Sequence, residues 1–204
     1  MNPYPASHAD LGVSPWVQRW SHLVAPGARV LDVACGSGRH VRWFAQRGCS
    51  VTAIDRDAAA VTPLRSVANV VVADLEATAW PLPGQTFDAV LVTNYLWRPL
   101  LPSLIASLAP HGVLIYETFA LGQQTVGRPA NPAFLLAPGE LLSACAGLRV
   151  VAFEDGFVAD PERYVQRIVA VREVPDLATP ARYALAARVA SAAPLKCADH
   201  EGSA

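Results

Sequence analysis

The chain has 204 residues, of which 52% are apolar and 16% charged, and its formal net charge is −1. This balance excludes an intrinsically disordered chain and gives no overall electrostatic attraction to nucleic acid. Fifteen of the sixteen basic residues are Arg, and the only Lys, Lys196, lies near the C-terminus, which argues against a phosphate-binding or Schiff-base lysine.

The cysteine, histidine and apolar patterns exclude further classes of protein. The four Cys and five His residues are scattered without the paired spacing of a zinc site, so we expect no bound metal. The N-terminal sequence MNPYPASHADLG has neither the basic head nor the apolar run of a signal peptide. No apolar run approaches the roughly 20 residues that a membrane span needs. We therefore predict a cytoplasmic protein with free thiols that does not contact a membrane.

Short apolar runs alternate with stretches of helical periodicity through the first part of the chain. The runs that predict strands are 28–34, 50–54, 69–73, 86–93 and 111–117. The stretches that predict helices between them are 38–48, 57–66 and 99–108. Apolar strands separated by helices are typical of a parallel sheet that is covered on both faces. The pattern therefore predicts an α/β fold.

The last third of the chain has a different pattern. A Gly- and Pro-rich connection over residues 118–138 leads to a short predicted helix over 139–146. Two strand-like segments follow at 148–154 and 164–173, separated by a short turn-rich stretch. Strands joined this closely are usually antiparallel neighbours. We therefore expect an antiparallel pair at one edge of the sheet.

Residues 1–173 are interpreted as one domain, because no linker or internal repeat interrupts them. Within this domain, residues 1–27 are expected to form an N-terminal helical cover with Trp16 and Trp20 on one helix. That helix either covers the open side of a bound ligand or packs against the sheet. Residues 174–204 are Ala-rich with a weak helical pattern, which predicts a helical or loosely ordered tail.

A glycine loop follows the first predicted strand, in the sequence VLDVACGSGRH. In α/β folds, nucleotide-like and anionic ligands bind at such a loop and at the helix it opens. Gly36 and Gly38 allow positive φ and a close approach of the backbone, so we expect Val at position 38 to block a ligand without unfolding the sheet. The dinucleotide fingerprint GxGxxG would need glycine where the chain has Val41, which disfavours a nicotinamide cofactor.

Three carboxylates accompany the first three predicted strands. Asp32 lies in the first strand, Asp55 closes the second and Asp74 closes the third, so all three are expected at one edge of the sheet. A ligand ammonium group would give Asp32 a partner. Asp55 can accept hydrogen bonds from a ribose diol, and Asp74 from an adenine amine while the N–H of Leu75 donates to the ring. The alternative is that Asp55 and Asp74 cap the helices after them.

Four segments together resemble the class I S-adenosylmethionine-dependent methyltransferases. They are LDVACGSGRH, TAID, VADLE and FDAVLVTNYLW, and the resemblance covers about residues 28–117 and continues to about 173. Within that class the sequence of these segments is most similar to that of small bacterial tellurite-resistance methyltransferases. The resemblance implies a Rossmann-like, doubly wound, seven-stranded sheet that is mostly parallel with an antiparallel closing strand. It also implies S-adenosylmethionine as the cofactor.

The resemblance further implies where the cofactor contacts lie. Gly36 and Gly38 would pack against the methionyl part of the cofactor, and Asp32 would face its ammonium group. Asp55 would bind the ribose and Asp74 the adenine. The full set of residues placed at the cofactor is Asp32, Ala34, Cys35, Gly36, Gly38, Asp55, Arg56, Asp74, Leu75 and Asn94.

The methyl acceptor is expected beside the segments that follow the fourth and fifth predicted strands. Tyr95 or Trp97 either faces the sulfonium through a cation–π contact, worth about 0.5–2 kcal/mol, or packs in the core. The sequence Asn-Tyr-Leu-Trp from Asn94 lacks the prolines of the (Asp/Asn)-Pro-Pro-aromatic motif of base-methylating enzymes. The candidates for substrate binding are Trp97, Arg98, Phe119 and Arg128. The candidates for a catalytic role are Asn94, Tyr95, Arg98 and His40.

We therefore expect an enzyme that transfers a methyl group by in-line displacement to a small-molecule acceptor, with no nucleic-acid partner. The connection over 118–138 would close over the acceptor, since connections this long are usually functional lids or disordered. Arg98 and Arg128 either bind an anionic acceptor or are solvated surface residues. Two other classes stay open, namely a non-catalytic S-adenosylmethionine-binding protein and a nicotinamide-dependent oxidoreductase. The sequence predicts no oligomeric state.

Overall fold

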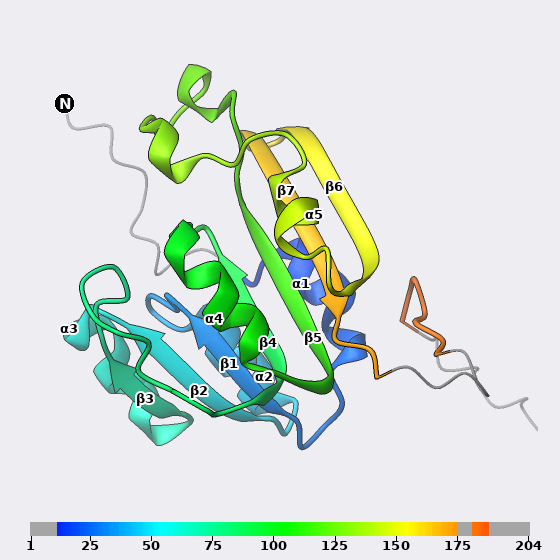
Figure 1. The fold of residues 1–204 in the computed structure, drawn as a ribbon. Helices are drawn as coiled ribbons and strands as arrows, with labels where there is room; N and C mark the ends of the chain where they lie inside the picture. The colour runs from blue at the N-terminus through cyan, green and yellow to red at the C-terminus, as the bar shows by residue number, and fades with distance from the viewer. Residues whose placement is uncertain (1–11, 175–180, 188–204) are drawn as a thin grey trace, which may run out of the picture.

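A seven-stranded mixed sheet forms the centre of the structure, in the order β3-β2-β1-β4-β5-β7-β6 (Figure 1). The computed structural model describes residues 12–174 and 181–187. The strands are β1 (Arg29–Val33), β2 (Ser50–Asp55), β3 (Asn69–Val72), β4 (Phe87–Thr93), β5 (Leu108–Phe119), β6 (Arg149–Ala159) and β7 (Glu162–Val171). The first five run parallel, and β7 is antiparallel to β5 and β6. This topology confirms the predicted fold class.

Short helices connect the strands. The α-helices are α1 (Pro15–Trp20), α2 (Arg39–Gln46), α3 (Ala58–Val61), α4 (Leu101–Ala106) and α5 (Glu140–Ala144). The 3-10 helices are η2 (Ser21–Leu23), η3 (Thr62–Ser66), η4 (Arg98–Leu100), η5 (Gln123–Thr125) and η6 (Pro132–Phe134). The helix predicted over 57–66 is thus α3 followed by η3. Pro63 explains the break, because proline has no N–H to donate within an α-helix.

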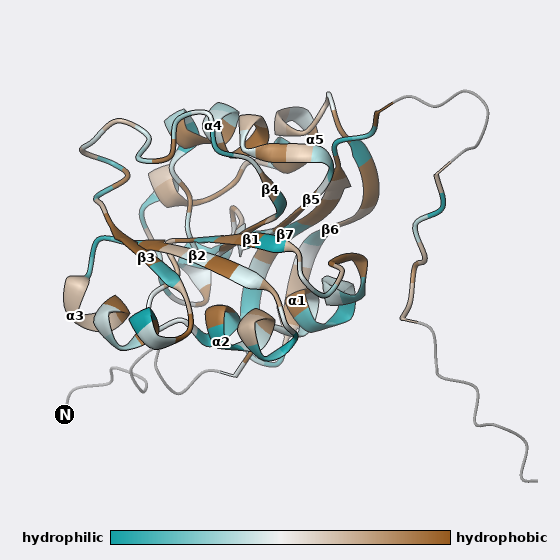
Figure 2. Ribbon diagram, turned by 90° about the horizontal axis from the view of Figure 1, so that it is seen from below, coloured by the Kyte–Doolittle hydropathy of each residue, from teal (hydrophilic) through white to brown (hydrophobic). Residues whose placement is uncertain are grey.

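Helices cover both faces of the sheet, as Figure 2 shows with α1, α2 and α3 on one side and α4 and α5 on the other. One apolar cluster packs beneath the first group and includes Trp16, Trp20 and Phe44. A second cluster packs under α4 and α5 and includes Leu104 and Leu141. The central strands β1, β4 and most of β5 are buried on both faces, which is why they appear in the sequence as continuous apolar runs, whereas the edge strands β3 and β6 are partly exposed.

The N-terminal helix α1 packs against the sheet. Trp16 and Trp20 are 2% and 0% exposed, and their ring centroids lie 5.7 Å apart in an edge-on arrangement. The Ser14 hydroxyl caps the helix by accepting from the Trp16 and Val17 N–H groups. Of the two roles considered for this helix, the structure shows packing against the sheet.

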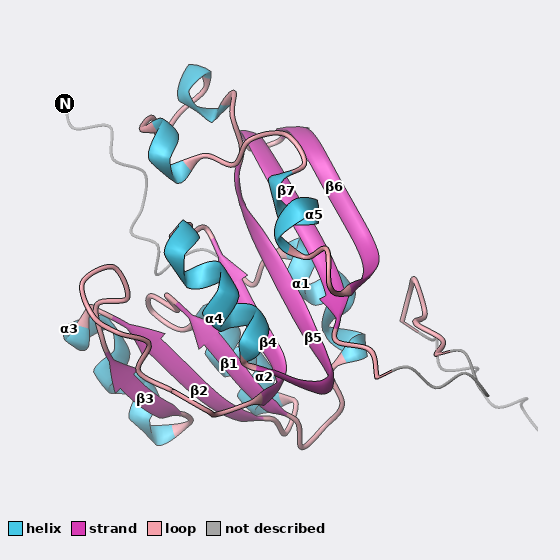
Figure 3. Ribbon diagram, viewed as in Figure 1, coloured by secondary structure: helices cyan, strands magenta, loops and turns pink. Residues whose placement is uncertain are grey.

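The β6–β7 hairpin is longer than its sequence predicts (Figure 3). The stretch predicted as turn-rich is mostly strand, and β6 reaches Ala159 before the chain turns into β7. Phe157 stands opposite Tyr164 in the register, and their ring centroids are 4.9 Å apart. Such cross-strand aromatic pairs stabilise a hairpin whose Gly and Asp content resembles a loop.

The connection after β5 is ordered and partly regular. A β-bridge joins Ala120 to Leu136, and η5 and η6 lie between these two residues. Leu135 and Leu136 are buried, so the second half of the connection is anchored in the protein interior. Beyond β7, residues 181–187 have no regular structure, and Tyr183 packs against the first apolar cluster. The remaining part of the predicted tail lies outside the described residues.

Candidate functional site

The glycine loop lies at the carboxyl end of β1 and has a left-handed backbone at three positions. The φ angles are +52° at Ala34, +55° at Gly36 and +77° at Gly38. A Cβ atom at Gly36 would meet nothing within 4 Å, whereas one at Gly38 would overlap the side chain of Leu64. Gly36 therefore leaves the loop open to a ligand. Gly38 has a left-handed backbone and its Cβ position lies against Leu64, so Val at this position would strain the loop, which revises the expectation that it would leave the fold intact.

Asp55 ties the glycine loop to the end of β2. One carboxylate oxygen accepts from the Gly36 N–H at 2.7 Å, and the other accepts from the Asp57 N–H at 2.9 Å. The N-cap of α3 is Asp57, which accepts from the N–H groups of Ala59 and Ala60. Asp57, and not Asp55, therefore caps the helix that follows β2. Each Asp55 oxygen keeps a lone pair with which a ligand hydroxyl can hydrogen-bond.

Asp32 is the most unusual polar group at this edge of the sheet. It is 1% exposed, and within the described part of the chain neither carboxylate oxygen has a partner at good hydrogen-bond geometry, the nearest donor being the Val41 N–H, which lowers the pKa only slightly. Burial raises the pKa of Asp32 to about 8; Arg39 opposes this shift and Asp55 adds to it. A buried carboxyl group without a partner is costly. A cationic group of a ligand would satisfy it.

Asp74 and Leu75 follow β3 at the same edge. Asp74 is half-buried and accepts from the Glu76 N–H at 3.0 Å, and Leu75 is buried. The Tyr95 hydroxyl is buried without a hydrogen-bond partner among the described residues. Burial raises the pKa of Tyr95 to about 12, and the nearby carboxylates of Glu76 and Asp74 add to the shift. Tyr95 thus faces the acidic end of β3.

Asn94 forms the sharp turn at the end of β4. Its φ is +55°, and its backbone N–H donates to the Glu117 carbonyl at 2.9 Å. The exposed residue Arg56 follows β2, close enough to Tyr95 to lower its pKa. Cys35 continues the β1–β2 pairing, since its N–H donates to the Ile54 carbonyl at 3.0 Å. The predicted cofactor residues therefore meet at the carboxyl ends of β1 to β4.

His40 is a buried neutral side chain. It is 1% exposed, its Nε2 accepts from the Ser14 N–H at 3.2 Å, and its Nδ1 lies 3.5 Å from the Thr93 hydroxyl. Burial, with a smaller contribution from the charge of Arg39, lowers the pKa of His40 to about 3. These contacts hold the segment before α1 against the end of β4. They favour a structural role, and a catalytic one stays a prediction.

A buried ion pair lies on the expected acceptor side, and although the segment from Glu117 was expected there, its partner was not predicted. Glu117, 2% exposed at the end of β5, has a carboxylate oxygen 3.1 Å from the Arg167 Nε on β7. The two residues stand opposite each other in the β5–β7 register. The sequence shows an acidic residue in one predicted strand and a basic residue in another. It does not show the register that places them opposite each other, so the ion pair could not be predicted from it.

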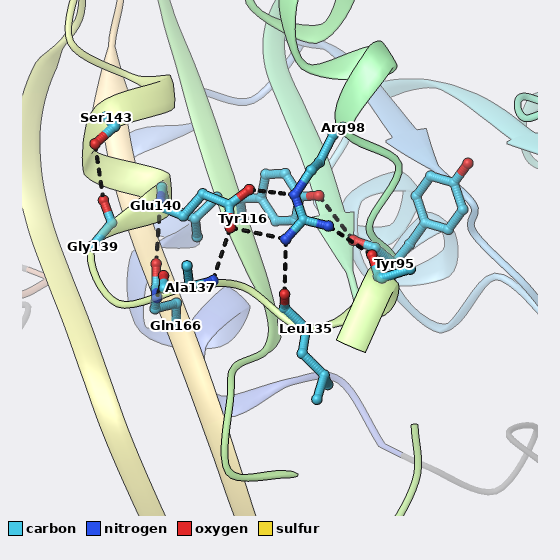
Figure 4. Close-up of polar contacts among 11 residues, drawn as sticks. Tyr95, Arg98, Tyr116, Leu135, Ala137, Gly139, Glu140, Ser143 and Gln166 are labelled. Carbon is cyan, nitrogen blue, oxygen red and sulfur yellow. Dashed lines mark hydrogen bonds and ion pairs between the residues drawn. The ribbon is translucent and has the colours of Figure 1, made fainter. Parts of the chain in front are cut away.

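The remaining acceptor-side candidates lie on or near the connection. Arg98 contacts Glu140 and two backbone carbonyl groups (Figure 4). Trp97 is half-buried and packs against the second apolar cluster, and Phe119 is half-buried at the end of β5. The Arg128 carbonyl accepts from the Gln123 side chain at 3.0 Å. Their predicted contacts with an acceptor stay predictions.

Residues 12–174 and 181–187 contain no cluster of His, Cys, Asp or Glu that could hold a metal ion. Across the same residues, no helix is both long and apolar enough to cross a membrane. Two surface hollows lie away from the glycine loop. One is beside β6 and residues 181–185, and the other is between α4, Ala144 and Arg172. Neither contains a predicted cofactor residue.

Comparison with known sequences identifies relatives of this chain. A family described as a methyltransferase domain matches residues 30–112. The malonyl-[acyl-carrier protein] O-methyltransferase of Serratia marcescens is 30% identical over 141 residues, which are 61% of this chain and 54% of that protein. The chain thus spans about half the length of this curated relative.

Solved structures share the fold. TehB from Haemophilus influenzae superposes with a TM-score of 0.62 at 19% identity, over 83% of this chain and 63% of that one. A SAM-dependent methyltransferase from Methanosarcina mazei gives a TM-score of 0.63 at 15% identity, over 81% of this chain and 100% of that one. At these identities the likeness shows the fold. It confirms the predicted Rossmann-like sheet with its antiparallel strand.

Proposed function

From the premise that this chain carries an S-adenosylmethionine-dependent methyltransferase domain of class I fold, we propose that it transfers a methyl group from S-adenosylmethionine to a small-molecule acceptor. The S-adenosylmethionine cofactor predicted from the sequence is the one that this domain implies.

The observation that carries the proposal is the unpartnered carboxyl group of Asp32 beside the open glycine loop. S-adenosylmethionine has an amino group that is cationic at neutral pH, and a buried carboxylate is a fitting partner for it. Asp55, held by two backbone N–H groups, is oriented to accept from ribose hydroxyls. The residues present therefore fit the cofactor.

The chain's own contribution to the reaction is positioning and the exclusion of water. When bound, the cofactor would supply a methyl group on its sulfonium sulfur, and in-line displacement by the acceptor would break the sulfur–methyl bond and leave the cofactor as a neutral thioether. Such a step depends on holding the two reactants in line and on removing water from them. Gly36 and Asp55 hold the donor, while the ordered connection and the turn at Asn94 border the acceptor side. The proposal assigns no proton-accepting residue.

The acceptor is proposed to be a small molecule for two reasons. The formal net charge of −1 gives no general attraction to nucleic acid. The Asn-Tyr-Leu-Trp sequence at the end of β4 lacks the prolines found in base-methylating enzymes. The Serratia relative is named for a malonyl group carried on a protein, so a carrier-bound carboxylate belongs among the acceptors to be tested.

Two alternatives make different predictions. A non-catalytic binding protein would keep the cofactor site and lack turnover. A nicotinamide oxidoreductase would need a third glycine in the loop, but Val41 is fully buried in the apolar cluster under α2 at that position. We therefore rank the binding protein as the second candidate.

The proposal is tested by incubating the full chain with methyl-radiolabelled S-adenosylmethionine. The acceptors are a panel of small carboxylates, amines, thiols and phenols, together with malonyl-acyl carrier protein and folded RNA. We expect label in at least one small acceptor. Tight binding of the donor without label in any arm supports the binding protein, and label in RNA alone overturns the small-molecule proposal.

A further inference from the structure

One arginine joins three segments around the acceptor side of the site (Figure 4). Arg98 follows the end of β4, and its Nε and one Nη bind the two carboxylate oxygens of Glu140 on α5 at 2.7 and 2.9 Å. The same guanidinium donates to the carbonyl groups of Ala133 at 2.7 Å and Leu135 at 2.8 Å. Most of its donors are therefore used inside the protein.

Glu140 holds the other end of this arrangement. Besides Arg98, its Oε2 accepts from the Ala137 N–H at 2.8 Å. The Glu140 side chain is 21% exposed and that of Arg98 is 41% exposed. The hydrogen bonds between them lower the pKa of Glu140 and raise that of Arg98. The pair is thus ionised and bidentate, which is the geometry in which arginine is most specific for a carboxylate.

The groups on either side of the pair are fixed to the sheet. Gln166, buried on β7, accepts from the Leu141 N–H at 3.1 Å and donates to the Ala137 carbonyl. On the other side, the Tyr116 hydroxyl donates to the Tyr95 carbonyl at 2.9 Å. Arg98 is therefore the link between a loop anchored on β5 and a segment anchored on β7.

The hydrogen bonds of Arg98 to backbone carbonyl groups fix the second half of the connection between β5 and α5. Ala133 and Leu135 lie where the connection returns toward Ala137, and Phe134 between them is 38% exposed. On the N-terminal side of Arg98, three residues earlier in the chain, lies Tyr95, whose hydroxyl is near the carboxylates of Glu76 and Asp74. One side chain therefore connects the cofactor edge to the segment that borders the acceptor.

We infer that Arg98 and Glu140 are positioning residues that hold the second half of the connection against the loop after β4, and so shape the acceptor site. This inference rests on the proposed function. It replaces the idea that Arg98 binds an anionic acceptor directly, because that contact would require the guanidinium to leave Glu140 and two carbonyl groups.

The first test measures the connection without any acceptor. Chymotrypsin can cut after the exposed Phe134, whereas trypsin is a poor probe because Arg128 precedes Pro129. In Arg98→Ala we expect cleavage at Phe134 to be at least tenfold faster, with a smaller increase in Arg98→Lys and Glu140→Gln. Arg29→Lys is the matched control, since its ion pair with Asp88 is looser, at 3.6 Å, and lies far from the connection along the chain.

Two further measurements separate this role from a general loss of structure. Affinity for S-adenosylmethionine should stay within twofold in every variant, and circular dichroism should show a folded protein. Adding Glu140→Gln to Arg98→Ala should not speed cleavage further, because the pair acts as a unit. Unchanged cleavage in Arg98→Ala would overturn the inference, as would independent and additive effects of the two substitutions.

Once the radiolabel assay supplies acceptors, turnover tests the positioning role itself. We expect Arg98→Ala to raise the KM for the acceptor at least tenfold, by a similar factor for neutral and anionic acceptors, with partial recovery in Arg98→Lys. A loss confined to anionic acceptors would instead show direct binding by Arg98 and overturn the inference. If no acceptor is ever labelled, the proposed function fails while the cleavage experiment still decides the positioning role.

Discussion

At the scale of single residues, the buried carboxyl group of Asp32 lowers the stability of the folded protein, although it is proposed to favour binding of the cofactor. Its carboxyl group is buried without a partner, and burial raises its pKa to about 8. In the absence of ligand the folded protein is therefore less stable at alkaline pH than it would be with a neutral side chain there. A cationic ligand group beside Asp32 would remove this cost, as proposed for the cofactor amino group.

Replacing Asp32 with Asn is expected to reduce the pH dependence of stability between pH 6.5 and 8. The folded-state pKa of about 8 lies above the ordinary 3.8. The folded protein therefore keeps a proton that the unfolded chain has released, and stability falls as the pH rises through this range. The slope is at most about 1.4 kcal/mol per pH unit. Thermal unfolding of both proteins measures the difference.

The lower limit of that range is set by His40. Its folded-state pKa of about 3 lies below the ordinary 6.5, so its own contribution is stability lost as the pH falls from 6.5 toward 3. At pH 6.5 His40 still adds about half of its full slope, which fades above about pH 7.5; because His40 is present in both proteins, this contribution cancels in the comparison of wild type with Asp32→Asn. An identical pH dependence in wild type and Asp32→Asn would contradict a buried, protonated carboxyl group.

The two loop glycines are expected to respond differently to substitution. Gly38→Ala places a Cβ into Leu64 at a φ of +77°, and should destabilise the protein by about 2–4 kcal/mol through strain and overpacking. Gly36→Ala meets nothing within 4 Å, so it should cost about 1 kcal/mol in stability and weaken cofactor binding at least tenfold. Urea unfolding and calorimetric titration separate the two effects. Full cofactor affinity in Gly36→Ala would show that the loop is only a turn.

At the scale of elements, local patterns predicted the parallel strands well. β1, β2 and β4 are apolar runs that lie under helices on both faces, and the sequence locates them within a residue or two. β5 and β6 extend further than predicted, because their ends pair with β7, as Phe119 does with Val165 and Phe157 with Tyr164. The contact of Arg98 with Glu140 joins residues 42 apart in the sequence, and no local pattern predicts it.

The N-terminal helix offers a prediction at this scale. Trp20 is fully buried between α1 and the sheet. Trp20→Ala should therefore destabilise the protein by about 3–5 kcal/mol, as expected for removal of a buried aromatic side chain. Chemical denaturation measures the change, and Leu185→Ala, at a position 65% exposed, is the control that should change little. A loss below about 1 kcal/mol would contradict the assigned packing of α1.

At the scale of the whole molecule, the cofactor side and the acceptor side come from different parts of the chain. The family match covers residues 30–112, which include the glycine loop, Asp55, Asp74 and the turn at Asn94. The proposed acceptor side is formed by β5, the connection and the β6–β7 hairpin, which lie mostly beyond that match. The proposed cofactor residues could therefore be inferred from short motifs. The acceptor could not, because its site depends on contacts between distant segments.

The central claim is that the carboxyl edge of β1 to β3 binds S-adenosylmethionine, and calorimetric titration of the cofactor into the full chain tests it most directly. We expect wild type to bind one equivalent. Asp55→Ala should bind at least tenfold more weakly, a loss of about 1.4 kcal/mol or more, while Asp88→Asn on the remote surface pair binds as wild type does. Absence of binding by wild type, or unchanged affinity in a folded Asp55→Ala protein, would contradict the account.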